Sequence, residues 1–157
     1  MPPPVILDPT QIDWNHIIAD REAIARILPH RHEFALLDGV VLLDTTAMTF
    51  AGFHEVRPDA FWARGHIPGR PLLPGVLMVE VGAQLASFAH ATAFPGAPFM
   101  GFIGIDGVRF RGAVEPPCRL QIVGRGTQMK PRRFVAQLQG FVNGNMVYEG
   151  EIMGMGL

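Results

Sequence analysis

The chain has 157 residues, with 13 Lys and Arg, 14 Asp and Glu, and a formal net charge of -1. This length fits one domain, and a chain of about 150 residues buries roughly two thirds of its unfolded surface. Charged residues make up 17%, against roughly 25% in an average soluble domain. These values argue against a disordered chain and a uniformly basic nucleic-acid binder. A low content of charged residues suits a subunit that buries much of its surface against copies of itself. The alternative is a weakly charged monomer.

The sequence favours a cytoplasmic protein. Cys118 is the only cysteine, so no disulfide can form within the chain and a reducing compartment is indicated. The start, MPPPVILDPTQIDW, has no basic segment followed by a long apolar one, so no signal peptide is predicted. The most apolar stretch, 72–94, contains Glu80, Gln84 and His90, and we interpret it as a buried core helix rather than a membrane span.

The N-terminal elements are predicted from prolines and apolar spacing. Four prolines indicate an irregular arm over the first dozen residues. Isoleucine and leucine recur near helical spacing over 13–28, which predicts one or two helical segments that end before Pro29. The runs 34–44 and 46–56 are rich in Val, Leu, Thr and Phe and are predicted to be two strands.

A long loop and a single central helix follow. The loop, 58–75, contains GHIPGRPLLPG, and structured loops of this length usually carry function. From 75 to about 92 the sequence is apolar on nearly every face, which predicts a helix that is buried all round.

The rest of the chain is predicted to form about four strands, which makes the fold α+β: one antiparallel sheet packed against one long apolar helix. Asn143-Gly144-Asn145 is a hairpin signal between the last two. We expect an N-terminal arm and helix over 1–23 and a single domain over 24–157. The predicted strands include 108–111, 120–127, 133–142 and 146–155.

Glu80 is the first candidate for chemistry. It lies in GVLMVEVGAQLASFAH among apolar neighbours, where an ionised carboxylate is unfavourable unless it is paired or faces a cavity. Desolvation favours the protonated carboxyl and makes Glu80 a candidate general acid. Gln84 lies four residues on, on the same helical face, and is expected to orient it. The competing interpretation is a helical glutamate that reaches the surface or a structural arginine.

His66 and Gly75 complete the candidate site. His66 lies in Gly-His-Ile-Pro-Gly, and a neutral histidine held in such a turn can act as a base. Pro74 and Gly75 stand where the helix begins, so the first helical N–H groups are open to an oxygen that gains negative charge. The alternative for His66 is a loop histidine that caps a carbonyl. The alternative for Pro74 and Gly75 is an ordinary helix start.

Other chemistries are not supported by the sequence. His30-Arg31-His32 lacks a Cys, Asp or Glu cluster at zinc-like spacing, so no metal site is predicted. No serine nucleophile elbow, P-loop or dinucleotide-binding glycine motif is present. Five further side chains could either line an acyl tunnel or pack in the core, and the sequence favours neither role. They are Phe88, Phe94, Phe99, Met100 and Phe102.

Two motifs resemble one family. Leu-Pro-His-Arg followed by Phe-Ala-Leu-Leu-Asp, over 28–38, is similar to the LPHR-x-P-F-L-L-V-D block of the 3-hydroxyacyl-acyl carrier protein dehydratases. GHIPGRPLLPGVLMVE with the following Ala-Gln, over 65–84, resembles their long signature GHFPGRPxxPGVLxxE-x-x-AQ. The resemblance extends over about 24–155.

The resemblance implies a hot-dog fold that converts a (3R)-3-hydroxyacyl thioester into the trans-2-enoyl thioester. It implies that His66 and Glu80 are catalytic, that the Gly75 amide binds the thioester carbonyl, and that Gln84 supports the acid. It also implies an acyl carrier protein as partner and a homodimer, commonly a trimer of dimers, in which His66 and Glu80 of one site come from different chains. No metal or redox cofactor is expected, nor a nucleic-acid or membrane partner.

Several positions depart from the family pattern, and two other functions stay open. Glu33 replaces the usual Pro, Gly39 the usual Arg, and Arg64 the usual Gln; Val81-Gly82 replaces Ala-Met. None of these removes a proposed catalytic group. The alternatives are a hot-dog acyl thioesterase, in which Glu80 activates water, and a non-catalytic acyl-binding subunit. Seven of the 13 basic residues follow position 100 and are interpreted either as solvated strand faces or as a surface for the acidic carrier protein.

Overall fold

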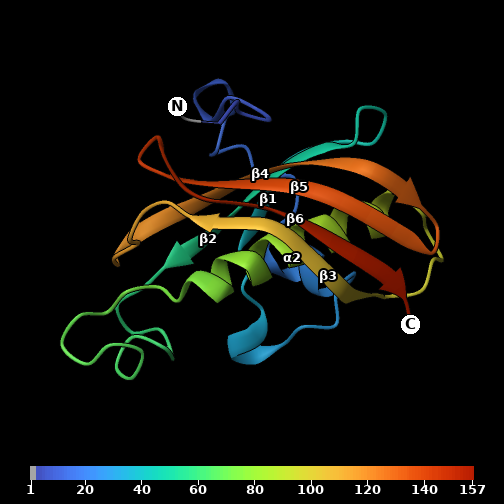
Figure 1. Cartoon of the computed structure of the whole chain (residues 1–157). Coiled ribbons are helices and arrows are strands. Elements are labelled where there is room, and N and C mark those ends of the chain that lie inside the picture. Colours follow the sequence, from blue (N-terminus) through green and yellow to red (C-terminus); the bar gives the residue numbers. More distant parts are fainter. Residues whose placement is uncertain (1–2) are drawn as a thin grey trace.

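The computed structural model describes residues 3–157 and shows a curved antiparallel sheet around one long helix (Figure 1). The strands lie in the order β1-β2-β4-β5-β6-β3, so β1 and β3 are the edges. The predicted α+β, hot-dog architecture is confirmed. The elements in chain order are η1 (Pro9–Gln11), α1 (Arg21–Ala25), η2 (His32–Phe34), β1 (Gly39–Asp44), β2 (Thr49–Val56), α2 (Gly75–Ala93), β3 (Met100–Phe110), β4 (Cys118–Lys130), β5 (Arg133–Val142) and β6 (Asn145–Gly156).

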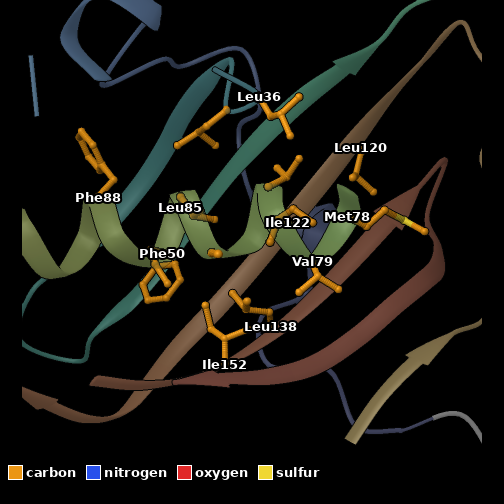
Figure 2. Close-up of a cluster of buried hydrophobic side chains, with 14 of the residues drawn as sticks. Leu36, Phe50, Met78, Val79, Leu85, Phe88, Leu120, Ile122, Leu138 and Ile152 are labelled. Atoms are coloured by element: carbon orange, nitrogen blue, oxygen red, sulfur yellow. The ribbon is translucent and has the colours of Figure 1, made fainter. Parts of the chain in front are cut away.

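The central helix α2 forms the core with the inner face of the sheet. Figure 2 shows this cluster, which includes Leu85 of α2, Ile122 of β4 and Leu138 of β5. The observed helix ends one residue beyond the predicted range. Both of its ends are marked by residues that disfavour a helix interior, since Pro74 precedes the first turn and a Pro-Gly pair follows the last. By length and composition α2 also qualifies as a membrane span, but 61% of that stretch is buried inside the protein.

The N-terminal arm lies on the outer face of the sheet, opposite α2 (Figure 1). The Gln139 side chain accepts the backbone N–H of Ile6 and donates to the carbonyl of Pro4, both at 2.8 Å. Arg119 donates to the carbonyl of Trp14 at 3.2 Å. The arm therefore covers an apolar patch that the sheet alone would leave in water; this patch consists of Val41, Ala51, Phe53, Val123 and Phe141.

Of the predicted helical region 13–28, only α1 is helical. Residues 14–15 form a turn, and Ala19 forms an isolated bridge with Val40. Ile18 and Ala19 donate to the carbonyl of Val40 at 2.8 and 3.2 Å, and Ala19 accepts from Val40 N–H at 2.9 Å. This segment therefore pairs with the outer edge of β1, and the spacing of its isoleucines does not form a helix face.

Strand boundaries also differ from the prediction, most of all at the starts of β1 and β3. Residues 34–38 do not join β1, because the backbone N–H of Leu36 donates to the side chain of Gln84 instead of to a strand. β3 begins at Met100, eight residues before the predicted strand, because its first half is apolar on both faces and shows no alternation. By contrast, β5 has the predicted bounds 133–142, since turns enclose it on both sides.

Candidate active site

Glu80 lies in the second turn of α2 with its side chain 19% exposed. The Gln84 side chain donates from Nε2 to Oε1 of Glu80 at 3.0 Å, as the four-residue spacing on a helix allows. His30 approaches the same oxygen, with 3.8 Å between its Nε2 and Oε1. The carboxyl group thus accepts a hydrogen bond from Gln84 and has a ring nitrogen of His30 near the same oxygen.

Gln84 is itself held from several directions. It is 2% exposed, and its Nε2 also donates to the carbonyl of Phe34 at 2.8 Å. Its Oε1 accepts the backbone N–H groups of Leu36 at 3.1 Å and Leu37 at 3.2 Å. With both ends of the amide satisfied, Gln84 has one favourable orientation, and that orientation presents a donor to Glu80.

The segment 34–38 that holds Gln84 is anchored on β2. The His54 Nδ1–H donates to the carbonyl of Leu36 at 2.6 Å. Asp38 accepts the backbone N–H of Glu55 at 2.7 Å and forms ion pairs with His54 and Arg21. Burial alone would raise the pKa of Asp38, but these hydrogen bonds and charges outweigh it and lower the pKa below the ordinary value of 3.8.

Asp38→Asn is expected to lower the free energy of unfolding at pH 7 by about 1–3 kcal/mol, because a buried charge-assisted network loses its acceptor. The folded carboxyl has the lower pKa, so its stabilisation is present above pH 3.8 and is lost as the pH falls through the folded value. Urea denaturation of both proteins at pH 7 and at pH 3 measures this. A difference that stays constant with pH would contradict the assignment.

His66 is exposed in the loop between β2 and α2. Its backbone N–H donates to the carbonyl of Trp62 at 2.9 Å, and its Nδ1 lies 2.8 Å from the carbonyl of Leu72. A carbonyl can only accept, so the ring proton is on Nδ1 and Nε2 keeps a free lone pair. Gly69 has φ of +83°, a conformation that favours glycine and turns the chain beside His66. In its neutral tautomer, the ring thus keeps Nε2 available to accept a proton.

Gly75 is the first residue of α2, and no side chain caps this end of the helix. The first N–H groups of a helix have no partner inside it. A Cβ at position 75 would lie 3.0 Å from three ring atoms of Phe110, so glycine allows this close approach. The start of α2 therefore combines free N–H groups with an aromatic ring from the end of β3.

One chain does not bring all of the predicted site residues together. Gln84 and Glu80 are in contact, whereas within residues 3–157 His66 has no hydrogen bond or ion pair with Glu80. His30 was not predicted as a neighbour of Glu80, although it stands in the Leu-Pro-His-Arg motif. Across the described residues, no three His, Cys, Asp or Glu side chains are grouped so that they could hold a metal ion.

The five candidates for an acyl tunnel differ in exposure. Phe88 and Met100 are each 5% exposed and pack in the core. Phe94 is partly buried and packs against the ring of His90. Phe99 is 40% and Phe102 is 49% exposed, next to or on the edge strand β3. Of the five, Phe99 and Phe102 therefore present the most apolar surface to a ligand or to another chain.

Comparison with known proteins identifies the family. A family model described as FabA-like domain matches residues 28–151. A 3-hydroxyacyl-[acyl-carrier-protein] dehydratase FabZ from Caldicellulosiruptor saccharolyticus is 36% identical over 137 residues, which cover 85% of this chain and 96% of the relative. The chain belongs to the FabA-like family. His66, Gly75 and Glu80 all lie within the part that matches the FabA-like domain.

Solved structures share the fold at low sequence identity. The dehydratase heterocomplex ApeI:P from Xenorhabdus doucetiae has a TM-score of 0.71 at 18% identity, covering 85% of this chain and 90% of that one. A hypothetical thioesterase from Streptococcus pneumoniae, solved with coenzyme A, has a TM-score of 0.57 at 8% identity, covering 75% of this chain and 84% of that one. Dehydratase and thioesterase structures therefore share the architecture of this FabA-like chain, and the fold alone does not separate the two activities.

Proposed function

We propose that this chain dehydrates a (3R)-3-hydroxyacyl thioester on acyl carrier protein to the trans-2-enoyl thioester, in fatty-acid or related lipid synthesis. The observation that carries the proposal is a carboxyl group, Glu80, held by Gln84 on the core helix of a FabA-like chain. The 36% identity to a dehydratase along 96% of that relative supports the same reaction.

In the proposed reaction, His66 is the base and the start of α2 binds the carbonyl. The free Nε2 of His66 takes a proton from C2 of the substrate. Negative charge then develops on the thioester oxygen, where the Gly75 N–H and the positive end of the helix dipole stabilise it.

Glu80 is the proposed acid. It gives its proton to the departing 3-hydroxyl group, which leaves as water while the C2–C3 double bond forms. Gln84 keeps the orientation of its carboxyl group through the hydrogen bond to Oε1. His66 and Glu80 thus end the step with opposite changes in charge, and solvent restores both. All of these steps use side chains and amides of the protein, without a metal or redox cofactor.

A second copy of the chain is the proposed occupant of the β3 edge. The other edge of the sheet, β1, is covered by the segment that contains Ile18, whereas among residues 3–157 β3 has β6 as its one strand partner. Phe102, Ile103 and Ile105 on β3 are each about half exposed, and with Val76 they line an apolar groove of about 320 Å³. An exposed apolar edge strand is a surface for pairing with another chain.

The same dimer explains the separation of His66 from Glu80. The β3 edge runs along the start of α2, as the contact of Phe110 with Gly75 indicates. A partner chain on this edge would bring its His66 loop toward Glu80 of the first chain. Mass measurement of the native chain in solution distinguishes a dimer from a trimer of dimers.

The carrier protein is proposed to dock near the start of α2. Arg109 and Arg111 flank Phe110, whose ring lies against Gly75. Arg111 is paired with Glu149, whereas Arg109 has no ion pair with an acidic group anywhere in 3–157. An exposed arginine at this place suits an acidic carrier. The proposed cytoplasmic setting rests on Cys118 being the only cysteine.

Reversible hydration of a trans-2-enoyl thioester tests the proposed function. The native chain is incubated with enoyl thioesters of several chain lengths on acyl carrier protein, and loss of the conjugated double bond and release of free thiol are followed together. We expect hydration without thiol release. Thiol release without hydration would instead support a thioesterase, and binding with neither reaction would support an acyl-binding subunit; both outcomes contradict the proposal.

A further inference from the structure

His30 lies beside Glu80 without a role in the mechanism above. Its ring stacks on Phe34 with 6.4 Å between centroids and meets the edge of Phe99 at 5.9 Å. Its side chain is 19% exposed, and its Nε2 lies 3.8 Å from Oε1 of Glu80. The ring is therefore held between two aromatic side chains with one nitrogen toward the carboxyl group.

The other nitrogen of His30 decides which tautomer is present. Nδ1 is buried and, in the part of the chain from residue 3 onward, has no hydrogen-bond partner. A buried N–H without an acceptor is less favourable than a lone pair without a donor. The neutral ring therefore carries its proton on Nε2, so an N–H group faces Glu80.

The surroundings of His30 favour this neutral form. Burial lowers its pKa, Glu80 opposes that shift, and the neighbouring Arg31 adds to it, so the pKa stays below the ordinary value of 6.5. The charged groups near the ring are thus Glu80 from α2 and Arg31 from its own turn. The other ring contacts, Phe34 and Phe99, carry no charge.

We propose that His30 is a positioning residue that, together with Gln84, holds Oε1 of Glu80 so that Oε2 exchanges the proton with the substrate. This inference rests on the proposed function. In a protonated carboxyl group one oxygen accepts hydrogen bonds and the other carries the proton. The hydrogen bond from Gln84 to Oε1, with the His30 ring nitrogen 3.8 Å from the same oxygen, therefore favours the proton on Oε2.

The same arrangement stabilises the product of proton transfer. When Oε2 gives its proton to the departing hydroxyl group, negative charge spreads over both oxygens of Glu80. Gln84 already donates to Oε1 at 3.0 Å, and His30 stands 3.8 Å away with its N–H directed there. Catalytic hydrogen bonds are often long in a free enzyme and shorten when substrate binds. His30 is expected to close this gap in the complex.

A pair of variants that differ by one methylene group tests the inference. The amide nitrogen of His30→Gln can reach the place of Nε2, whereas that of His30→Asn stops near Nδ1. We expect kcat for enoyl-thioester hydration to stay within about threefold of native in His30→Gln and to fall about ten- to a hundredfold in His30→Asn, with KM little changed.

The pH profile gives a second readout that a purely structural role would not change. Hydration needs ionised Glu80 to take a proton from water. Loss of a donor to the carboxylate should move the acid limb of the kcat/KM profile to higher pH in His30→Asn but not in His30→Gln. His32→Asn, in the same turn and at a residue with φ of +55° that Asn tolerates, is the matched control and should leave the profile unchanged.

The outcomes separate this inference from the proposed function. An inactive native chain would overturn the proposed function. An active native chain with equal kcat and equal pH profiles in both variants, whether both native-like or both reduced, would overturn only the role of His30. Thermal unfolding of each variant shows whether it is folded; if His30→Asn is unfolded, a His30→Gln enzyme with native Tm and a shifted acid limb would equally overturn the role.

Discussion

His66→Asn and Glu80→Gln should each lower the rate of enoyl-thioester hydration by about 10²–10⁴, the usual contribution of a positioned acid or base. Both substitutions keep the local structure. Asparagine at position 66 can still donate to the carbonyl of Leu72, and glutamine at position 80 can still accept from Gln84. Each change thus removes the proton-transferring group and leaves the loop or helix in place.

Mixing the two inactive variants should restore activity. If one site takes His66 from one chain and Glu80 from the other, a mixed dimer has one intact site and one that lacks both groups. Random exchange of subunits makes about half of the dimers mixed, so about a quarter of the native activity should return. Subunits are exchanged by joint refolding, and the fraction of mixed dimers is measured with a tag on one variant.

Glu33→Gln is the control for these experiments, since Glu33 is an exposed carboxylate in the short helix η2. It should keep native activity and should not rescue either inactive variant. Mixed dimers that form without any gain in activity would show that the two residues do not share a site across chains. Native rates in either single variant would show that the catalytic residue is misassigned.

Ile105→Lys should separate the proposed dimer into monomers. Ile105 is 51% exposed on β3, and Ile152 of β6 is its backbone partner in the sheet. A lysine there would place an unpaired charge in the interface, and each 1.4 kcal/mol of that penalty weakens association by about tenfold. We expect the dissociation constant to rise by at least about a hundredfold.

Activity should fall with the loss of the dimer, although no proposed catalytic residue is changed. Sedimentation equilibrium and the hydration assay over the same range of protein concentration measure the two effects together. Ile17→Lys is the matched control, because Ile17 is 47% exposed and lies outside β3. A native chain that is already monomeric, or an Ile105→Lys monomer with full activity, would contradict the shared site.

The parts of the fold that sequence reasoning predicted well have signals at both ends. α2 starts after Pro74 and ends before a Pro-Gly pair, and its apolar composition predicted that it would be buried. β5 lies between two turns that could be recognised from their residues. The family, too, could be predicted, because the motif around His66 and Glu80 is long and contiguous.

The prediction failed where a segment depends on a distant partner. Ile18 lies in a stretch with helical spacing, yet it pairs with Val40 at the edge of the sheet. Leu36 and Leu37 have strand-like composition, yet their N–H groups bond to the side chain of Gln84. In both cases a hydrogen bond to a distant residue outweighs a weak local preference.

By itself, the sequence determined the class of fold, the central helix, the family and the candidates His66, Gly75, Glu80 and Gln84. These follow from turn residues, apolar spacing and contiguous motifs, which act between residues close together in the chain. Only the tertiary structure decided that Gln84 organises the segment 34–38, that His30 stands beside Glu80, and that β3 is the uncovered edge. These features depend on the path of the backbone between residues tens of positions apart, which no local pattern encodes.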